Sequence, residues 1–496
     1  MQPLSVGRRR TDTKTMDNSG DLRVLLDSRY PLLLIETREE ERFLTILREV
    51  AADLDLPLWI WSATRGLARD GYPVQYRTVD PVRALDFVAF LENPGVFVFA
   101  DAHPALDNPL VVRRTKEVAA AIRPGQTLIL TAPQLSTPPE LAELAHRWKL
   151  RPPSRNELEA LVHRTIQDLQ SRDFPVALDG DATDELVTAL AGLTLRQAAR
   201  LVRRAALHDG EFSASDVPRV MRSKAELLAG DGILEIVDAP VTMEDVAGFA
   251  VFKDWLAIRS APAAGAAPPR GVLLTGIPGC GKSLIAKAIA GSQQWPLVLL
   301  DPGRLYGKYV GESEGRLAAA LDTVDAMAPA VLWIDEIEKG FATGGDGDGG
   351  VSRRLLGTFL HWMQERPPGV FLVATANDVS ALAPEMLRKG RFDELFFVDL
   401  PDGDARRAIF RIHLAQRELD PDAFDLDALA ALTDGFSGAE IETAIVGAHY
   451  RAAAGTAPID TGIIAAELRQ AVPLAASRPE DIARLRTWAN GRAKSA

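Results

Sequence analysis

Short apolar runs alternate with longer amphipathic stretches through the second half of the chain. The apolar runs lie at residues 272–275, 297–301, 331–335, 370–376 and 395–400. Strands of this length separated by helical stretches are typical of a parallel sheet with helices on both faces. After the last run the apolar residues recur with the helical period, which predicts an all-helical lid. Its expected helices span residues 405–416, 426–432, 438–451 and 463–469.

The first half of the chain repeats this arrangement in outline. Its apolar runs lie at residues 32–35, 58–61, 96–100 and 127–130, and helical stretches follow from about residue 155 to residue 208. The helix starts at Ser154 and Thr194 compare with those at Asp404 and Ser437 in the later lid. Internal similarity of this kind predicts a diverged duplication of one α/β unit with its helical lid.

Composition narrows the class of protein. At 496 residues the chain is long enough for two or more separately packed units. Its net charge of -12 argues against non-specific binding to nucleic acid or to an anionic membrane. The single cysteine, Cys280, excludes an intramolecular disulfide and a zinc site of the multi-cysteine kind. No apolar run is long enough to span a membrane, and the polar stretch around Arg8 is unlike a secretory signal. We therefore expect a cytoplasmic protein without membrane insertion.

A phosphate-binding motif follows the first apolar run of the second half. Residues 276–283 fit the pattern G-x-x-x-x-G-K-S/T, between an expected strand and an expected helix. Glycines in such a loop let backbone N–H groups turn toward phosphates, Lys282 neutralises the outer phosphates, and the Ser283 hydroxyl ligates Mg²⁺. The predicted nucleotide contacts of this loop are Gly276, Pro278, Gly279, Cys280, Gly281, Lys282, Ser283 and Leu284.

Two adjacent carboxylates follow the expected strand at residues 331–335. Asp335 is predicted to hold Mg²⁺ through its water shell, and Glu336 to orient and deprotonate the water that attacks the γ-phosphate of ATP. A strand that merely ends in solvated acids would explain neither their order nor their spacing from the phosphate loop. Asn377, after the next strand, is placed to bind both the γ-phosphate and this water.

Two arginines precede the last expected strand. Arg388 and Arg391 lie three residues apart, and their delocalised charge suits the charge that develops in phosphoryl transfer. Together with the preceding motifs, these residues resemble the AAA family of ATPases over about residues 241–473. The resemblance implies that Asn377 is a sensor, that both arginines act in the site of a neighbouring subunit, and that the chain forms a homo-oligomer, expected to be a hexamer.

The same resemblance implies further contacts to ATP. The positions that match the family's adenine and ribose contacts are Asp245, Val246, Gly248, His413, Gly438 and Ala439. The family usually has two glycines after the residues that match Asp245 and Val246, whereas this chain has Ala247 followed by Gly248. His413 alone would be taken for a helix-surface histidine. Its position in the lid helix favours a nucleotide contact.

A loop after the second strand resembles the one that grips a polypeptide in the pore of such rings. Its residues are Lys308, Tyr309 and Val310, and Tyr309 is the expected substrate contact. The alternative is a tyrosine packed against the following helix. In the segment 342–350, glycines alternate with acids, but the closing glutamate of a calcium loop is missing. We therefore expect a flexible loop there.

The likeness extends to one branch of the AAA family. Segments at residues 29–32, 37–42, 246–256 and 328–336 are similar to the chloroplast hypothetical-reading-frame AAA family, number forty-six, of algal plastids and bacteria. A plastid stroma is therefore the expected location if the gene is plastid-encoded. A degenerate N-terminal unit is part of this resemblance.

The first unit lacks phosphate chemistry. Its loop at residues 36–41 has no glycine or lysine, and four carboxylates there would repel phosphate, so we predict no ATP binding. The run at residues 96–100 is followed by Asp101, which is read as keeping one acid of the later pair but not the catalytic one. This unit is expected to serve packing, ring assembly or partner recognition.

The fold class expected is a P-loop NTPase three-layer α/β/α parallel sheet with an all-helical lid, preceded by a degenerate unit of the same kind. Gly230 and Gly232 mark the linker between them, and Met16 is an alternative translation start. The expected segments are a disordered tail (1–20), a degenerate α/β domain (21–150), a helical lid-like subdomain (151–224), a linker (225–240), an ATPase core (241–402) and a helical lid with a C-terminal helix (403–496).

Two functional hypotheses remain open. The first is a Mg²⁺-dependent ATPase that remodels a protein substrate. The second is a slow ATP-dependent regulatory or scaffolding module whose N-terminal unit binds partners. A DNA-associated ATPase is disfavoured by the charge and by the lack of a recognisable DNA-binding module, so no specific nucleic acid is expected. A membrane-bound protease of this family is disfavoured because no H-E-x-x-H motif occurs.

Overall fold

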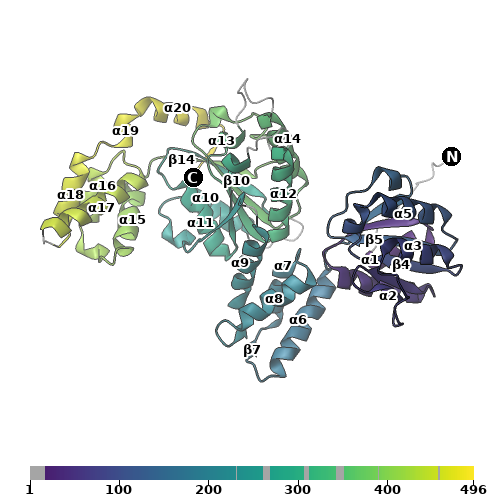
Figure 1. Ribbon diagram of the computed structural model, residues 1–496. Coiled ribbons are helices and arrows are strands. Elements are labelled where there is room, and N and C mark those ends of the chain that lie inside the picture. Colours follow the sequence, from purple (N-terminus) through teal and green to yellow (C-terminus); the bar gives the residue numbers. More distant parts are fainter. Residues whose placement is uncertain are drawn as a thin grey trace, which may run out of the picture. The chain divides into compact units, whose positions relative to one another are not determined.

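The computed structural model describes most of the chain as two compact units. The described residues are 17–230, 232–260, 268–305, 312–341, 351–388, 390–455 and 458–496. The units are Met1–Pro152 and Pro153–Ala496 (Figure 1). Among the described residues, no helix has both the length and the apolar character needed to span a membrane.

The first unit is a sheet covered by helices on both faces. Its strands stand in the order β3-β2-β4-β5-β1-β6, and all neighbours are parallel except β2 and β3. The strands are β1 (Leu32–Glu36), β2 (Leu58–Ser62), β3 (Gly66–Arg69), β4 (Gly95–Phe99), β5 (Gln126–Ala132) and β6 (Ala145–Lys149). The helices are α1 (Asn18–Asp27), α2 (Glu40–Asp53), α3 (Pro81–Phe90), α4 (His103–Leu106) and α5 (Pro109–Ala121).

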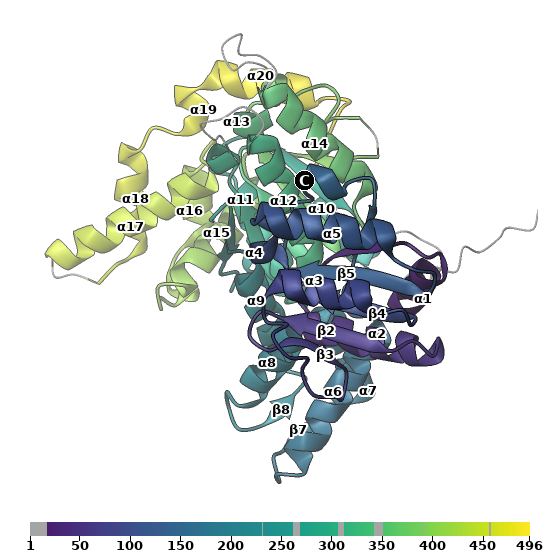
Figure 2. The same cartoon turned by 45° about the vertical axis from the view of Figure 1, so that its right-hand side comes forward.

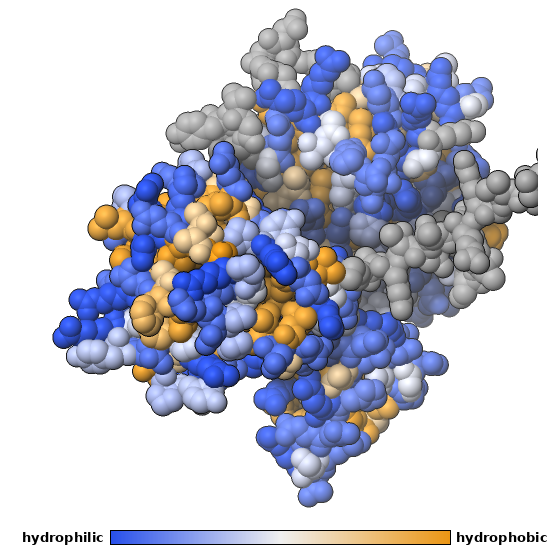
Figure 3. Space-filling model, turned by 90° about the vertical axis from the view of Figure 1, so that its right-hand side faces the viewer, coloured by the Kyte–Doolittle hydropathy of each residue, from blue (hydrophilic) through white to orange (hydrophobic). Residues whose placement is uncertain are grey.

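The unbroken apolar run in β1 follows from this covering. Leu32 and Leu34 pack in the cluster formed with α3 and α5, whereas Leu33 and Ile35 pack in the cluster formed with α1 and α2. A strand buried on both faces needs apolar residues at every position, which explains why alternation is absent here. Figure 3 shows one face of the molecule, where apolar side chains stand among polar ones.

The second unit begins with a small helical subdomain. Its helices are α6 (Arg155–Gln170), α7 (Gly180–Leu190), α8 (Leu195–Ala206) and α9 (Asp216–Leu228). Ser154 and Thr194 begin α6 and α8, each accepting a hydrogen bond from the backbone three residues later in a capping box. These two helix starts are therefore encoded locally.

Within the described residues, the second sheet has seven strands in the order β15-β14-β10-β13-β12-β11-β9. The strands are β9 (Leu234–Val237), β10 (Gly271–Gly276), β11 (Leu297–Leu300), β12 (Ala330–Ile334), β13 (Val370–Ala376), β14 (Glu394–Val398) and β15 (Lys494–Ser495). Buried side chains of β10 alternate between two clusters, with Leu273 on the face of α12 and α14 and Leu274 on the face of α10 and α11. These helices are α10 (Ala250–Ser260), α11 (Lys282–Gln293), α12 (Glu312–Met327) and α14 (Val351–Glu365).

A helical lid follows the sheet. Its helices, α15 (Gly403–Ala415), α16 (Leu426–Leu432), α17 (Gly438–Gly455) and α18 (Thr461–Gln470), enclose their own apolar cluster around Phe410 and Ile445. Two further helices, α19 (Leu474–Ser477) and α20 (Pro479–Ala489), run back from the lid to the sheet (Figures 1 and 2). The predicted lid helices agree with α15 to α18.

The two sheets share one strand order. Read from one edge, β6-β1-β5-β4-β2-β3 corresponds to β14-β10-β13-β12-β11-β9, and each order ends in an antiparallel edge strand. The edge strands differ in origin, because β3 follows β2 along the chain whereas β9 precedes β10. The predicted fold class, an ATPase-type α/β unit preceded by a second unit of the same kind, is confirmed.

Several predicted boundaries were wrong. The linker expected at residues 225–240 is mostly ordered secondary structure, because α9 continues through Leu228 and β9 pairs with β11 at the sheet edge. The glycines form turns between α9 and β9, but packed structure continues after them. The tail expected at residues 1–20 is helical from Asn18, where the side chain of Asp17 caps α1.

Helix α9 joins the helical subdomain to the second sheet through a buried lysine. Val217 and Val220 belong to the apolar cluster of the subdomain, and Ala225 to that of the sheet. Between them Lys224 is 1% exposed, and its Nζ donates to the carbonyl of Ala328 at 2.9 Å. Burial lowers the pKa of Lys224 to about 7.

Replacing this lysine should stabilise the protein in a pH-dependent way. The folded-state pKa lies below the unfolded value, so the unfolded chain binds more protons above pH 7, and the wild type gains stability as pH rises from about 7 toward 10.5. Lys224→Met removes the buried charge, and we expect a stabilisation of about 1–3 kcal/mol at pH 6 that shrinks by pH 9. Calorimetry of the full chain measures it.

The control is Arg222→Met, which removes an exposed cation from the same helix. Hydrogen bonding to Glu226 raises the pKa of Arg222, so this variant should show no such pH dependence between pH 6 and 9. A Lys224→Met variant less stable than the wild type at both pH values would contradict the assignment.

Candidate functional site

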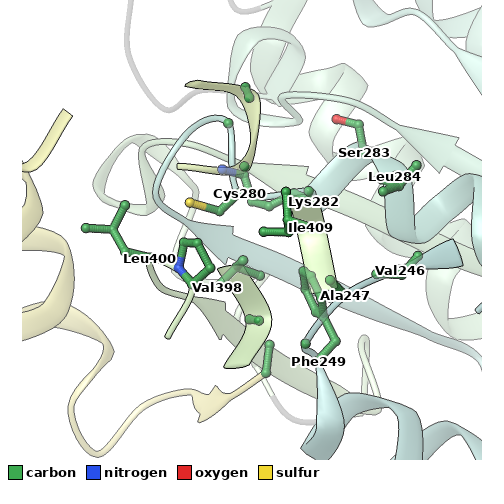
Figure 4. A pocket seen from close by; sticks show the side chains of 18 of the residues that line it. Val246, Ala247, Phe249, Cys280, Lys282, Ser283, Leu284, Val398, Leu400 and Ile409 are labelled. Carbon is green, nitrogen blue, oxygen red and sulfur yellow. The ribbon is translucent and has the colours of Figure 1, made fainter. Parts of the chain in front are cut away.

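A cavity opens where the parallel strands β10, β12 and β13 end. Its volume is about 720 Å³, and it lies between the second sheet and the lid. Leu400 and Val246 stand on opposite sides of this pocket, with Cys280 and Lys282 between them (Figure 4). The carboxyl edge of a parallel sheet is where ligands bind in folds of this kind.

The predicted phosphate loop forms the floor of the cavity. Gly276 ends β10 with φ +134°, and a Cβ at this position would lie 2.1 Å from the carbonyl oxygen of Val398, so only glycine fits. Gly281 takes φ +92° directly before α11. Residues 278–284 line the cavity, whereas Gly276 is not among the residues that line it. The loop therefore presents the N-terminus of α11, where backbone N–H groups favour an anion.

Lys282 is folded back onto its own loop. Its Nζ donates to the carbonyls of Gly276 and Ile277, each at 2.9 Å, and the residue is 7% exposed. Burial lowers the pKa of Lys282 to about 8. A buried ammonium held by two backbone carbonyls fits a partner that carries full negative charge, as phosphates do.

Oxygen atoms from three elements meet beside this lysine. The hydroxyl of Ser283 donates to Oδ1 of Asp335 at 3.0 Å, and that of Thr375 donates to the same atom at 2.5 Å. Mg²⁺ prefers hard oxygen ligands and keeps several of its waters. Ser283 and Asp335 therefore fit Mg²⁺, as the sequence predicts for them.

Glu336 stands next to Asp335 on a strained turn. Its backbone has φ +48°, and its N–H donates to the hydroxyl of Thr375 at 2.9 Å. Its carboxylate accepts a hydrogen bond from Nδ2 of Asn377 at 2.7 Å and pairs with Lys339. The hydrogen bond from Lys339, followed by that from Asn377, lowers the pKa of Glu336, so the carboxylate is ionised at neutral pH.

Three residues of this site were not predicted from the sequence. Besides Thr375 and Lys339, Glu338 accepts hydrogen bonds through Oε1 from the backbone N–H groups of Asn377, at 2.9 Å, and Asp378, at 3.3 Å. It thereby fixes the loop that carries the Asn377 amide. The sequence shows a third acid two residues after Glu336, but the N–H groups that it binds lie in the loop after β13, about 40 residues further along the chain.

The two predicted arginines lie away from this cavity. The described residues that line it include neither Arg388 nor Arg391. Arg388 is exposed, and Arg391 donates to the carbonyl of Glu385. Their segment is fixed by Asp393, whose carboxylate accepts hydrogen bonds from the N–H groups of Arg270 and Gly271 at the start of β10.

The predicted adenine and ribose contacts all line the cavity. They are Asp245, Val246, Gly248, His413, Gly438 and Ala439. The N–H of Ala439 donates to the carbonyl of Gly279 at 3.0 Å, which ties the lid to the phosphate loop. Burial lowers the pKa of His413, whose Nδ1 lies 3.8 Å from Glu442. The predicted pore residues Lys308, Tyr309 and Val310, and the segment 342–350, lie outside the described residues.

Comparisons with known proteins agree with this geometry. The model of the ATPase family associated with various cellular activities (AAA) matches residues 272–400. The uncharacterized AAA domain-containing protein ycf46 of Trieres chinensis is 34% identical, with 96% of this chain and 97% of that protein covered. The chain belongs to the AAA family of ATPases.

Other relatives extend the likeness of this AAA protein. The ycf46 protein of Pyropia yezoensis is 33% identical over 97% of this chain and 99% of its own length. The proteasome-activating nucleotidase of Aeropyrum pernix is 37% identical over 37% of this chain and 46% of that protein. Models of the N-terminal and second domains of SpoVK-like AAA ATPases match residues 18–150 and 156–231.

The first unit of the AAA chain shows where one prediction was wrong. Asp101 has φ +48°, and the N–H of Ala102 donates to the carbonyl of Thr131, as Ile337 does to Thr375 in the second sheet. Asp101 therefore matches Glu336, and the position of Asp335 holds an alanine, Ala100. The retained acid stands at the position of Glu336, for which catalysis is predicted, and the position of Asp335 has no acid.

The absence of ATP binding by the first unit stays a prediction. Burial, followed by the charges of Asp101 and Glu41, raises the pKa of Glu40. The carboxylate of Glu36 accepts hydrogen bonds from Arg147 and from the N–H of Leu135. Acidic side chains therefore stand at the edge where the second sheet carries its phosphate loop.

The lysine of the AAA phosphate loop predicts how ATP affinity depends on pH. Without ATP the pKa of Lys282 is about 8, and bound phosphates should raise it. Binding of ATP therefore takes up a proton above pH 8, and the affinity falls as pH rises. We expect affinity for MgATP to fall up to about tenfold per pH unit between pH 8 and 9.5. The phosphates do not titrate there, because their last pKa is about 6.

Calorimetric titration in buffers of different ionisation enthalpy measures both the affinity and the proton uptake. Lys282→Arg serves as the control, because an arginine stays charged and any remaining affinity should be independent of pH. Equal wild-type affinities at pH 7.5 and 9.5 would show that Lys282 does not titrate in this range.

Proposed function

We propose that this chain hydrolyses ATP as a subunit of a homo-oligomeric ring, and that it couples the turnover to remodelling of a protein substrate. The observation that carries the proposal is the meeting of Lys282, Ser283, Asp335, Glu336 and Asn377 in one cavity. Mg²⁺, when bound, would neutralise the charge that develops on the phosphates.

Each side chain has one role in the proposed hydrolysis. Lys282 leaves the two carbonyls that hold it and donates to the outer phosphates. Ser283 and Asp335 would hold Mg²⁺ and its waters. Glu336 accepts the proton of the attacking water, and Asn377 orients that water while it hydrogen-bonds the carboxylate at 2.7 Å. The ion pair between Glu336 and Lys339 must open for this proton transfer.

The proposed ring supplies what the single chain lacks. Arg388 and Arg391 stand outside the cavity of their own chain, on a segment anchored by Asp393. An arginine supplied in trans is worth about 10³-fold or more in phosphoryl transfer. Assembly would bring these arginines to the neighbouring cavity, and a hexamer is the assembly we propose.

Coupling to a protein substrate is the further part of the proposal. Two relatives are named a proteasome-activating nucleotidase and a cell division cycle protein 48 homolog. The cavity here lies between the sheet and a lid with a core of its own, so opening and closing of the site would move two bodies. Tyr309 is the proposed contact to the substrate.

The variant Glu336→Gln should separate binding from hydrolysis. Glutamine keeps the hydrogen bond to Asn377 but cannot accept the proton, so we expect kcat to fall by about 10²–10⁴-fold. The Kd for MgATP should stay within a few-fold of the wild-type value. Phosphate release and binding of a fluorescent ATP analogue measure the two quantities. Lys282→Ala is the matched comparison, because it should weaken binding itself; a Glu336→Gln variant with wild-type turnover would refute the assignment.

Mixing two inactive variants tests the ring. A subunit with Glu336→Gln keeps its arginines, and a subunit with Arg388→Ala keeps its own catalytic carboxylate. If arginines act in trans, equal mixing should restore about a quarter of the wild-type ATPase activity, because that share of sites has both parts. The same experiment is repeated with Arg391→Ala. Activities that merely average those of the two separate variants would show that the arginine does not act in trans.

A further inference from the structure

The end of the chain returns to the nucleotide site. We call residues 474–496, which comprise α19, α20 and β15, the C-terminal strap. It leaves the lid after α18, crosses to the second sheet as α19 and α20, and ends beside β14 (Figure 1). From the sequence, only a C-terminal helix is predicted here.

The strap packs directly beneath the phosphate loop. One apolar cluster contains Ile277 and Cys280 of the loop together with Ile482 and Leu485 of α20. Phe397 and Val398 of β14 complete it. The side of the loop that faces away from the cavity therefore rests on α20, so a displacement of α20 would leave the loop without its apolar support.

An ion pair joins α20 to the cavity wall. Arg486 donates to Asp399 through Nε, at 2.9 Å, and through Nη2, at 2.8 Å, and Asp399 lines the cavity. Hydrogen bonding to Asp399 raises the pKa of Arg486. A bidentate ion pair fixes the orientation of the carboxylate as well as its distance from the arginine. The position of Asp399 at the end of β14 thus depends on the strap.

The strap also reaches the sheet and the lid. Its strand β15 pairs in parallel with β14, the N–H of Ala496 donates to the carbonyl of Phe397 at 3.0 Å, and Ser495 and Ala496 line the cavity. At the other end, the N–H of Ala475 donates to the carbonyl of Gly435, where an added Cβ would lie 2.9 Å from the Cβ of Ala475.

We propose that the C-terminal strap is a positioning element of the nucleotide site, and that its docking on β14 and the phosphate loop sets the affinity for MgATP. This inference rests on the proposed binding of ATP in the cavity. The strap joins the lid, the loop and the end of β14, which are three of the walls that a bound nucleotide would touch. Because coupling of this kind is reciprocal, bound MgATP stabilises the docked strap to the same extent.

Two arginines of α20 provide a matched test. Arg486→Ala removes the pair with Asp399, and Arg484→Ala removes a cation that pairs with Asp481 on its own helix. We expect the Kd for MgATP to rise about three- to fivefold in Arg486→Ala, since the pair is half exposed, and to stay unchanged in Arg484→Ala. Arg486→Lys keeps a single hydrogen bond and should give an intermediate value.

A backbone variant and hydrogen exchange extend the test. Ala496→Pro removes the N–H that bonds to Phe397 and should raise the Kd by a similar factor. In the wild-type full chain, MgATP should slow amide exchange in α20 about threefold or more, whereas a merely structural strap would exchange equally with and without nucleotide.

The outcomes separate the two proposals. Wild-type protein that does not bind MgATP refutes the proposed function. Wild-type binding with an unchanged Kd in both Arg486→Ala and Ala496→Pro, and no slowing of exchange in α20, refutes the strap proposal alone. Circular dichroism identifies a variant that fails to fold, and the remaining variant then decides.

Discussion

The nucleotide site depends on the parallel register of β10, β12 and β13. Trp333 of β12 pairs with Val373 of β13, and Ile334 with Ala374, so Asp335 comes level with Thr375. Because side chains alternate between the two faces, a shift of one residue would turn Thr375 away from Asp335. The 2.5 Å hydrogen bond between them, and with it the place of Ser283, exists only in this register.

The same constraint explains why so much of the site could be predicted. Strands buried on both faces appear in the sequence as unbroken apolar runs. The run predicted at residues 370–376 has the same first and last residues as β13. Parallel strands must end at one edge, so the residues after each run are brought together even though many residues separate them. The phosphate loop and Asn377 could be predicted to lie at one edge of the sheet on this basis, without knowledge of any side-chain contact.

What escaped prediction depends on contacts that no local pattern encodes. β9 and β15 are edge strands of four and two residues, too short to show a period, and each is defined by its partner. The role of Glu338 follows from the loop after β13, which it binds across the sheet. The wrong prediction for Asp101 has a related cause. The match to Glu336 rests on a backbone turn with positive φ, which aspartate and glutamate can both adopt, so residue type alone does not reveal it.

The two sheets share a strand order but not the residues at the edge where their parallel strands end. The first unit keeps the strand order and the turn at Asp101, yet Ala100 stands where the second unit has Asp335, and the loop after β1 has no glycine. Conversely, the second unit needs more than its loop. Its cavity has walls from the lid and from residues 495–496, which lie more than 200 positions from Lys282 in the sequence. The sheet fixes where the chemistry occurs, whereas separately packed segments complete the enclosure. The enclosure of the site therefore depends on segments that pack apart from the sheet.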